Sequence, residues 1–423
     1  MSRWRRTLYT IFATQVLTLI GFSCVFPFFP LYIQTLGIAG PAVILWSGVI
    51  TFSGSFTLAV ASPIWGALAD RYGRKPMLIR AMTGGAVVTA LLIVAPNIWV
   101  VLILRVLQGT LTGTVAPARA LVAAVTPREE LGFSMGLMEA SIFLGSAVGP
   151  FAGGFLNDRL GFHGTFAVGS SLLAISAILV LFLIDEQFTP AASAGHHTLN
   201  PVANLRQTAL MPGLAILALV LFGANFANSV PSPVLPLLIP ELHGVPTIGG
   251  VPQVGTAVGL VLAVAGLCAT AAAWRTRLLT NRFGYRRTLI GALIVAGAFT
   301  VPAAIVGTVW QMLAVRAAVG LCIGAALPTV SALVSLMTPR GQQGSAYGLL
   351  ASAELIGFAL GPLVGGVIGA SLGLRATFLV PAAVLILVAM LVLTRVHIPP
   401  TAEITSVPHG AEPLAEEEVT PAT

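Results

Sequence analysis

The stretch Gly66-Ala-Leu-Ala-Asp70-Arg71-Tyr-Gly73-Arg74-Lys75-Pro76 joins two long apolar runs, at residues 43–67 and 77–95. It places four charged residues and two glycines within one short turn. An apolar helix that crosses a bilayer cannot continue through such a charge cluster, because each ionisable group in the hydrocarbon core is costly. The chain must therefore leave the bilayer at this turn and re-enter it at once.

The composition is that of a protein whose solvent is lipid. Hydrophobic residues make up 57% of the 423 positions and charged residues 8%, and the mean hydropathy is +0.96. A soluble fold of this composition would lack polar surface, so we expect the lipid bilayer to be a partner of the whole chain. The net charge of +7 does not indicate a nucleic-acid partner, because the basic residues lie at the ends of apolar runs.

The apolar runs predict an all-α integral membrane protein with twelve spans, since each span needs about 20 residues. The runs fall at residues 8–33, 43–67, 77–95, 98–124, 132–156, 162–184, 207–240, 252–276, 288–305, 308–336, 344–369 and 375–396. Residues 1–184 and 207–398 then form two six-helix bundles, joined by a polar cytoplasmic linker at 185–206. The acidic residues 399–423 predict a disordered cytoplasmic tail.

The two halves are copies of one another. Arg71-Tyr-Gly-Arg74 reappears as Arg282-Phe-Gly-Tyr285, 211 positions later (282 − 71). At the same offset Arg105 recurs as Arg316 and Pro117 as Pro328, and Gly149-Pro150-x-x-Gly153-Gly154 recurs after 212 positions as Gly361-Pro362-x-x-Gly365-Gly366. Motifs that return in the same order at a nearly constant offset indicate duplication. The sequence therefore predicts two pseudo-symmetric bundles, arranged as parallel repeats about an axis along the membrane normal.

The distribution of basic residues predicts the orientation in the membrane. With the N-terminus in the cytoplasm, the cytoplasmic segments hold Arg3, Arg5, Arg6, Arg71, Arg74, Lys75, Arg80, Arg128, Arg206, Arg275, Arg277, Arg282, Arg286, Arg287, Arg340 and Arg395. The opposite side keeps Arg159 and Arg375. Because cytoplasmic loops carry an excess of Lys and Arg, we expect both termini in the cytoplasm. Twenty arginines against one lysine indicate a GC-rich bacterial genome, so we expect the chain in a bacterial cytoplasmic membrane.

The turn that joins the second and third runs resembles the corresponding loop of the major facilitator superfamily, G-x-L-A-D-R-x-G-R-K/R. The resemblance covers about the first 398 residues and implies a secondary transporter with twelve helices in two bundles. It also implies that the loop latches the halves together on the cytoplasmic side, where the charge of Asp70 suits the positive start of the eleventh helix. The residues of this latch are Gly66, Asp70, Arg71, Gly73, Arg74 and Lys75. A plain topogenic loop is the alternative.

Two further motifs are similar to those of the drug:proton antiporter branch of this superfamily. Arg105, in Leu104-Arg105-Val-Leu-Gln108-Gly109, matches a fourth-helix motif whose arginine the family assigns to proton coupling. A fixed positive charge favours the ionised form of a nearby carboxyl group, although Arg105 could also only hold backbone carbonyls. The antiporter motif is matched by Gly145, Gly149, Pro150, Gly153 and Gly154, whose small side chains allow close helix approach and can seal the outer side. Ordinary helix packing is the alternative.

Two acids inside apolar runs are candidates for proton coupling. Glu354 lies near the middle of the eleventh run, where a carboxyl group can bind a proton from one side and release it to the other. Its alternative role is a hydrogen bond to a neighbouring helix. Glu139 lies in the cytoplasmic third of the fifth run and could instead snorkel or pair with Arg119 on the fourth helix. The sequence leaves open which of the two titrates.

Aromatic and amide side chains on the first, fourth and seventh runs predict a cavity for small lipophilic molecules. In the resembling fold the first and seventh helices line the cavity, and a pocket of rings with few polar groups binds many apolar molecules loosely. The candidate lining residues are Phe22, Phe26, Gln108, Phe222, Asn225, Phe226 and Asn228. Each phenylalanine could instead face lipid or pack between helices.

These features favour a proton-coupled exporter of lipophilic or amphipathic drugs that works by alternating access. No phosphate-binding loop with a glycine–lysine signature, metal-ligand spacing or catalytic motif is present in the sequence. We therefore expect no enzyme activity, no cofactor and no metal, with the proton gradient as the energy source and a monomer as the working unit. The alternatives are a transporter of one metabolite such as a sugar, and a membrane sensor or scaffold that moves no solute.

Overall fold

The computed structural model describes residues 3–186, 212–338 and 343–395, and these are almost entirely helical. The first half holds α1 (Arg3–Ser23), η1 (Phe26–Phe28), α2 (Phe29–Thr35), α3 (Pro41–Tyr72), α4 (Arg74–Leu91), η2 (Leu92–Val94), α5 (Ile98–Leu111), α6 (Val115–Val125), η3 (Arg128–Glu130) and α7 (Leu131–Leu183). The second half holds α9 (Pro212–Ser229), α10 (Leu235–Leu238), η4 (Ile239–Glu241), β1 (Thr247–Ile248), β2 (Val251–Pro252), α11 (Val254–Phe283), α12 (Tyr285–Thr300), η5 (Pro302–Ala304), α13 (Val309–Met337), α14 (Gln343–Leu372), η6 (Arg375–Phe378) and α15 (Leu379–Arg395).

The described helices cross the membrane twelve times, as predicted. Ten helical segments are long and apolar enough to span a bilayer. One of them, α7, has 53 residues and contains two crossings, because its backbone bends at Gly161, where φ is 67°. The shorter apolar helix α9 supplies the remaining crossing. The predicted tail at 399–423 and all but the first two residues of the predicted linker at 185–206 lie outside the described residues.

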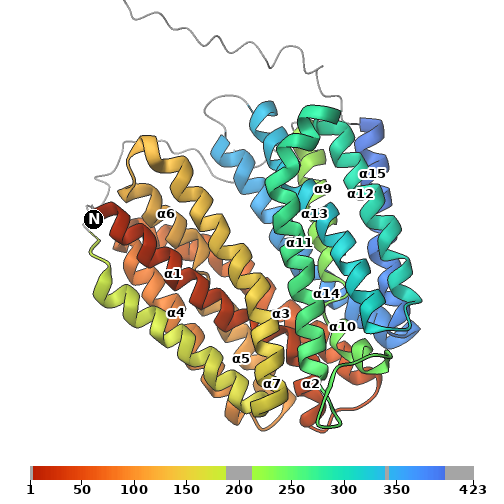
Figure 1. Ribbon diagram of the computed structural model, residues 1–423. Helices are drawn as coiled ribbons and strands as arrows, with labels where there is room; N and C mark the ends of the chain where they lie inside the picture. The colour runs from red at the N-terminus through yellow and green to blue at the C-terminus, as the bar shows by residue number, and fades with distance from the viewer. Residues whose placement is uncertain (1–2, 187–211, 339–342, 396–423) are drawn as a thin grey trace, which may run out of the picture.

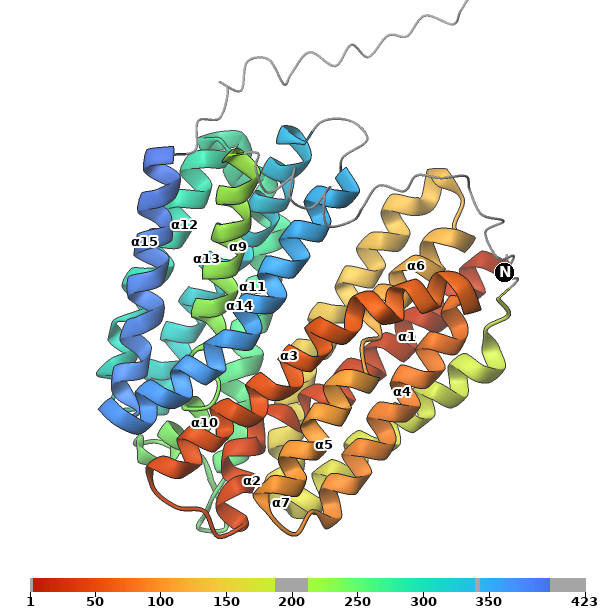
Figure 2. The same cartoon turned by 180° about the vertical axis from the view of Figure 1, so that it is seen from behind.

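The helices form two bundles, α1–α7 and α9–α15, which meet at one end and diverge at the other (Figures 1 and 2). We call the end with α2 and α10 the closed end, and the end where α1 begins and α15 ends the open end. Two pairs of helices make most of the contacts between the bundles, α3 with α14 and α7 with α11, and α2 also contacts α10 at the closed end. Both contacts are tightest in the closed half, where Gly48 meets Gly366 and Gly154 meets Gly255.

Two predicted runs are interrupted in the structure. The run at 8–33 breaks after Ser23 into η1 and α2, because Pro27 and Pro30 lack the amide donors that a continuous helix needs. The run at 98–124 breaks between α5 and α6 at Gly113, whose φ of 112° suits a residue without a side chain. A short hairpin, β1–β2, which the sequence did not predict, turns at Gly249 and Gly250, both with positive φ.

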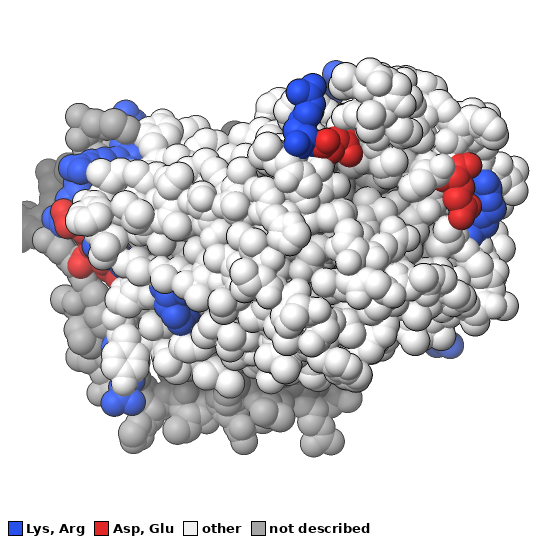
Figure 3. Space-filling model, turned by 90° about the horizontal axis from the view of Figure 1, so that it is seen from below, with Lys and Arg blue, Asp and Glu red and all other residues white. Residues whose placement is uncertain are grey.

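The outer surface is apolar, as expected for helices in lipid. Large hydrophobic side chains such as Trp274, 88% exposed, and Phe182, 75% exposed, point outward. Figure 3 shows the closed end from below as an almost uncharged face with isolated charged patches. Among the described residues, Arg159 and Arg375 lie near the closed end, whereas most other charged residues cluster at the open end. The charge asymmetry predicted from the sequence therefore corresponds to a difference in charge between the open end and the closed end.

Candidate functional site

A cavity of about 430 Å³ lies between the two bundles. The first bundle contributes residues of α1, η1, α3, α5 and α7 to its wall, and the second contributes residues of α9, α10, α11, α13 and α14. The cavity is thus shared equally between the duplicated halves. A site that both bundles build can be exposed to one side of the membrane and then the other when the bundles rock.

Arg105 enters the cavity wall from α5 and is 5% exposed. Its Nη1 donates a hydrogen bond to Oε1 of Gln108 at 2.8 Å, and Nε2 of Gln108 donates to the hydroxyl of Thr89 at 3.1 Å. The faces of Phe26 and Phe29 cover the guanidinium, with 4.3 and 5.0 Å from its carbon to the ring centroids. Such cation–π contacts and the glutamine hold the charge in place without neutralising it.

Arg316 reaches the same cavity from α13 in the second bundle. It is the duplicate of Arg105, so the two arginines approach the cavity from opposite bundles. The Nε atom of each is buried without a hydrogen-bond partner, and neither arginine has a salt-bridge partner among the described residues. None of the described residues that line the cavity is an aspartate or a glutamate.

Three of the seven predicted cavity residues line it, namely Phe26, Gln108 and Asn228. Phe22 lies behind Phe26, with 5.4 Å between the stacked ring centroids. The other three lie on α9 outside the cavity wall: Phe222 stacks on Phe226, and Asn225 bonds the Leu221 carbonyl. The sequence could not show which side of α9 faces the cavity, because most residues of this helix are apolar or small and its hydrophobic periodicity is weak.

The candidate acids lie outside the cavity wall. Glu139 pairs with Arg119 at 2.5 Å, which confirms the pairing that the sequence suggested as an alternative. Glu354 is exposed and lies one helical turn from Phe358, which lines the cavity, so both side chains are on one face of α14. The charges of Arg119 and Glu139 act on Glu354 from the opposite bundle.

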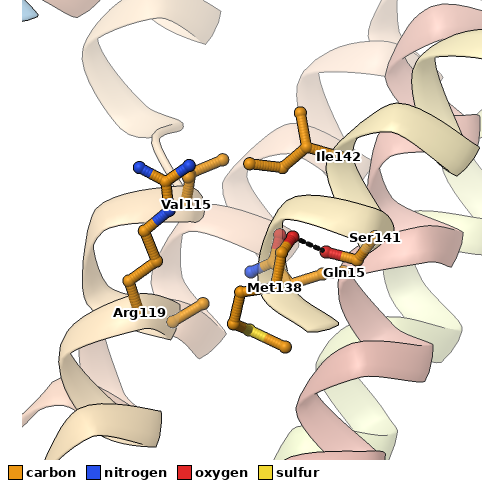
Figure 4. A pocket seen from close by; sticks show the side chains of 7 residues that line it. Gln15, Val115, Arg119, Met138, Ser141 and Ile142 are labelled. Carbon is orange, nitrogen blue, oxygen red and sulfur yellow. Dashed lines mark hydrogen bonds between the residues drawn. The ribbon is translucent and has the colours of Figure 1, made fainter. Parts of the chain in front are cut away.

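A small crevice lies beside Arg119, where α6 packs on the first part of α7 (Figure 4). Arg119 extends from α6 on one side, and Ser141 bonds the Met138 carbonyl on the other. Gln15 of α1 lies between them and exchanges hydrogen bonds with Thr114, so it fixes the break between α5 and α6. The crevice has no room for a water molecule, so it is a packing defect and not a ligand site.

The glycines of the predicted antiporter motif have two different partners. A Cβ at Gly145 or Gly149 would overlap Leu19 or Ser23 of α1, which belongs to the same bundle. A Cβ at Gly153 would overlap Cys24, the residue that follows α1. Gly154 and Pro150 face α11 of the other bundle, where Gly154 meets Gly255 and Pro150 meets Gly259. One face of the motif therefore packs within the first bundle, and the other face packs against the second bundle.

The duplicated motif repeats this division of roles. Cβ atoms at Gly357, Gly361 and Gly365 would overlap α9 of the same bundle. Gly366 and Pro362 instead meet Gly48 on α3 of the opposite bundle. Small residues allow backbone-to-backbone contact in the membrane. The closed end is thus sealed twice, by symmetry-related glycine contacts.

The loop predicted to latch the bundles makes its described contacts within the first bundle. The carboxylate of Glu186 accepts hydrogen bonds from the amides of Arg74 and Lys75 at 2.9 and 2.7 Å, and so caps the start of α4. Lys75 Nζ donates to the Leu181 carbonyl at 2.8 Å, Arg71 lies over Tyr72, and Gly73 has a φ of 98°. A Cβ at Gly66 would meet open space, and the side chain of Asp70 is not among those described. The bundles are apart at this end, so a latch would form only on closure.

Asp158 is a residue that the sequence reasoning missed. Its carboxylate oxygens accept hydrogen bonds from the amides of Gly255 at 2.9 Å and Thr256 at 2.6 Å, at the first turn of α11 in the other bundle. A negative charge there also interacts favourably with the helix dipole. The only sequence signal was a carboxylate close to the predicted outer end of the fifth run. The structure shows it to be a tie between the bundles at the closed end.

Two helical bundles around a shared central cavity, sealed at one end, define a membrane transporter of the alternating-access type. The model of the Major Facilitator Superfamily matches residues 11–278 and 217–420. The multidrug resistance proteins MdtG of Salmonella dublin and Salmonella arizonae are each 37% identical to the chain over 387 residues, which is 90% of this chain and 93% of theirs.

Solved structures share the fold at low sequence identity. A bacterial homologue of the human lysosomal transporter Spinster, in an inward-facing and occupied conformation, has a TM-score of 0.75 at 14% identity, covering 93% of this chain and 97% of its own. The human organic anion transporter MFSD10 has a TM-score of 0.64 at 20% identity, covering 93% and 100%. The chain belongs to the major facilitator superfamily, and it is a secondary transporter and not an enzyme.

Proposed function

We propose that the protein exports small lipophilic or amphipathic drugs from the bacterial cytoplasm in exchange for protons. The observation that carries this proposal is the cavity of about 430 Å³ that both bundles line and that the glycine contacts seal at one end. The similarity to the MdtG multidrug resistance proteins supports a drug as the cargo. Because one chain builds the whole cavity, a monomer suffices for transport.

The structure corresponds to the state that loads cargo from the cytoplasm. The open end carries most of the described arginines, and an excess of basic residues marks the cytoplasmic side. Both termini are then cytoplasmic, the closed end faces outward, and the loop at 66–76 is positioned to latch the bundles when the open end closes. The bacterial cytoplasmic membrane is the location that the Salmonella relatives support.

Glu354 is the proposed proton carrier, with Arg105 and Glu139 assisting. Glu354 lies one turn from the cavity wall, on the bundle opposite the Arg119–Glu139 pair, so rocking of the bundles would change its exposure and its charged neighbours. Moving one charge through 100 mV yields about 2.3 kcal/mol, enough for a roughly 50-fold drug gradient. The proton gradient therefore suffices as the energy source, and no cofactor is required.

The first prediction is that Glu354→Gln abolishes proton-driven export, because an amide cannot carry a proton. Cells of a drug-hypersusceptible bacterium that express the wild type should accumulate less Nile red, a neutral lipophilic dye, until a protonophore is added. Cells with Glu354→Gln should accumulate as much dye as cells without the transporter. Glu241→Gln, at an exposed acid of the closed end, is the matched control and should export normally.

Four outcomes would contradict this proposal or part of it. Undiminished export by Glu354→Gln would remove Glu354 from the mechanism, and loss of export in Glu139→Gln alone would transfer its role to Glu139. Transport confined to a single sugar, without protection against unrelated drugs, would identify a metabolite transporter. Absence of counterflow for every solute in proteoliposomes would identify a sensor or scaffold.

A further inference from the structure

A patch of five arginines lies at the open end of the second bundle, where α11 turns into α12 and α15 ends (Figure 1). The arginine patch consists of Arg275, Arg282, Arg286, Arg287 and Arg395. Four of these residues are exposed, and Arg286 is half-buried. Nη2 of Arg286 donates a hydrogen bond to the carbonyl of residue 393 at 2.5 Å, which ties the start of α12 to the end of α15. Cations from three helices therefore share this end of the bundle.

Acids offset the basic residues at the open end of the first bundle. Arg5 of α1 pairs with Glu130 at 3.4 Å. The carboxylate of Glu186 accepts hydrogen bonds from the amides of Arg74 and Lys75, where its charge also suits the positive start of α4. The first bundle thus supplies its own anions at this level of the membrane.

The duplicated half repeats the helix start without the acids. Tyr285 and Arg286 occupy the equivalent positions at the start of α12, 211 residues later (285 − 74). No aspartate or glutamate occurs within residues 272–300 or 379–395, and no described residue forms a salt bridge with the arginine patch. The internal copy therefore shows that an anion fits this position, and here the described residues do not supply one.

Exposed apolar side chains adjoin the arginine patch on the same side of α11. Arg275 and Arg282 are seven positions apart, so they lie two turns apart on one face of the helix. Leu278, 68% exposed, lies between them, and Trp274, 88% exposed, lies one turn further toward the centre of the bilayer. Tryptophan favours the interface between membrane and water, and long arginine side chains extend from there toward the surface. A phospholipid has the same arrangement, with a charged head above its acyl chains.

We propose that the arginine patch binds an anionic phospholipid in the leaflet at the open end. Planar guanidinium groups match phosphate oxygens in bidentate geometry, and basic clusters beside membrane spans attract anionic lipids. Arg282 and Arg287 flank the start of α12, so their exposed donors can hold the phosphate near the amides of its first turn. The acyl chains would then contact Trp274 and Leu278. A soluble anion would leave these two apolar side chains without a partner.

The experiment measures contact between the lipid and Trp274 in the purified full chain. Mixed micelles of a nonionic detergent contain phosphatidylglycerol or phosphatidylcholine with the same brominated acyl chains, because bromine quenches tryptophan fluorescence on contact. The part of the quenching that disappears in Trp274→Phe reports on this site. We expect half of that quenching at a mole fraction of phosphatidylglycerol that is at least roughly fivefold below that of phosphatidylcholine. One basic residue near a membrane surface contributes about this factor.

Single arginine variants locate the preference on the arginine patch. Arg282→Gln and Arg287→Gln should each weaken the binding of phosphatidylglycerol roughly fivefold. Binding of phosphatidylcholine should stay unchanged, which shows that the site has kept its shape. Arg277→Gln is the matched control and should keep the wild-type preference, because Arg277 is exposed on the same helix but lies two positions from Arg275 and so on the other face.

Several outcomes would overturn the inference. Equal quenching of the wild type by both lipids would show that the head group is not recognised. Displacement of phosphatidylglycerol by an equimolar amount of glycerol phosphate would identify a soluble phosphate compound as the ligand. A preference that appears only after removal of residues 399–423 would identify the acidic tail as the occupant. The measurement involves neither drug nor proton, so failure here is distinct from failure of the proposed function.

Discussion

At the scale of single residues, the environment of Arg105 depends on one uncharged neighbour. Gln108 accepts a hydrogen bond from Arg105 and donates one to Thr89, so it orients the guanidinium without cancelling its charge. A glutamate in its place would keep the first bond and accept a bond from the Thr89 hydroxyl instead. The position therefore allows the charge of the cavity to be changed while its shape is kept.

We predict that Gln108→Glu weakens proton-driven export of Nile red. The new carboxylate would neutralise Arg105 at a hydrogen-bond distance, so Arg105 would no longer favour the ionised form of a nearby carboxyl group. Dye accumulation in cells measures the export. Undiminished export by a monodisperse Gln108→Glu protein would show that the charge of Arg105 does not assist proton coupling.

The residue scale also shows what the sequence could and could not establish about the site. Arg105 and Gln108 were recognisable because they are neighbours in sequence, on one face of one helix. Asp158 and its partner Gly255 are 97 positions apart, so their contact depends on how two bundles meet and no local pattern reports it. The absence of an acid from the cavity wall is likewise a property of packing, because Glu354 differs from a lining residue only by one turn of α14.

At the scale of elements, the glycines of α7 lie on two faces of the helix that have different packing roles. Gly149 packs against Ser23 inside the first bundle, whereas Gly154 packs against Gly255 across the gap. The first contact must persist through the transport cycle, and the second must break when the closed end opens. Glycines of one sequence motif thus form both a contact that persists through the cycle and a contact that must break.

We predict that Gly149→Val and Gly154→Val fail in different ways. Overpacking costs about 1–3 kcal/mol, and at Gly149 this cost falls on the folded bundle, so the melting temperature and the yield of monodisperse protein should drop. At Gly154 the cost falls only on the state with a shut closed end, so the protein should fold but favour the opposite state. Equal melting temperatures and equal conformations for both variants would contradict this division.

Asp158 joins α7 to α11 at the same end, and its removal should shift the conformational equilibrium. Hydrogen bonds to a charged group contribute about 1.5–3 kcal/mol, and loss of about 2 kcal/mol corresponds to a roughly 30-fold shift. In Asp158→Ala we therefore expect spin labels at Ala39 and Val251, both exposed at the closed end, to show a larger population of long distances. The measurement requires replacement of the native cysteines, Cys24, Cys268 and Cys322.

Two comparisons make the Asp158 experiment decisive. Asp158→Asn keeps one acceptor oxygen but loses the charge, so its distance distribution should lie between those of the wild type and Asp158→Ala. Arg159→Gln alters the neighbouring residue, whose side chain lies over the ring of Phe155 on its own helix, and should leave the distribution unchanged. A wild-type distribution in Asp158→Ala would mean that the glycine contacts alone hold the closed end shut.

At the scale of the whole molecule, the twelve crossings and the duplication followed from sequence alone. Hydrophobic runs report burial in lipid directly, and the offset of 211 positions between Arg105 and Arg316 reports the repeat. Departures from symmetry were harder to predict: α5 breaks at Gly113, whereas its copy α13 continues through the equivalent Gly324. Side-chain bonds from Gln15 on α1 hold that break, and the sequence gives no sign of such a contact between helices.

The charge of the cargo sets the response of the whole transporter to membrane potential. Exchange of one proton moving inward for one neutral molecule moving outward transfers one positive charge inward, whereas exchange for a monocation transfers none. At 100 mV this charge contributes about 2.3 kcal/mol. The final prediction is that a potential imposed with valinomycin and a potassium gradient, without any pH difference, drives the neutral dye Nile red across proteoliposomes that contain the transporter.

Glu354→Gln in the same vesicles provides the control, because a transporter without its proton carrier should not respond to the imposed potential. Its vesicles should move Nile red no faster than protein-free vesicles. Movement of the dye by the wild type that responds only to a pH difference would instead indicate an exchange that transfers no net charge.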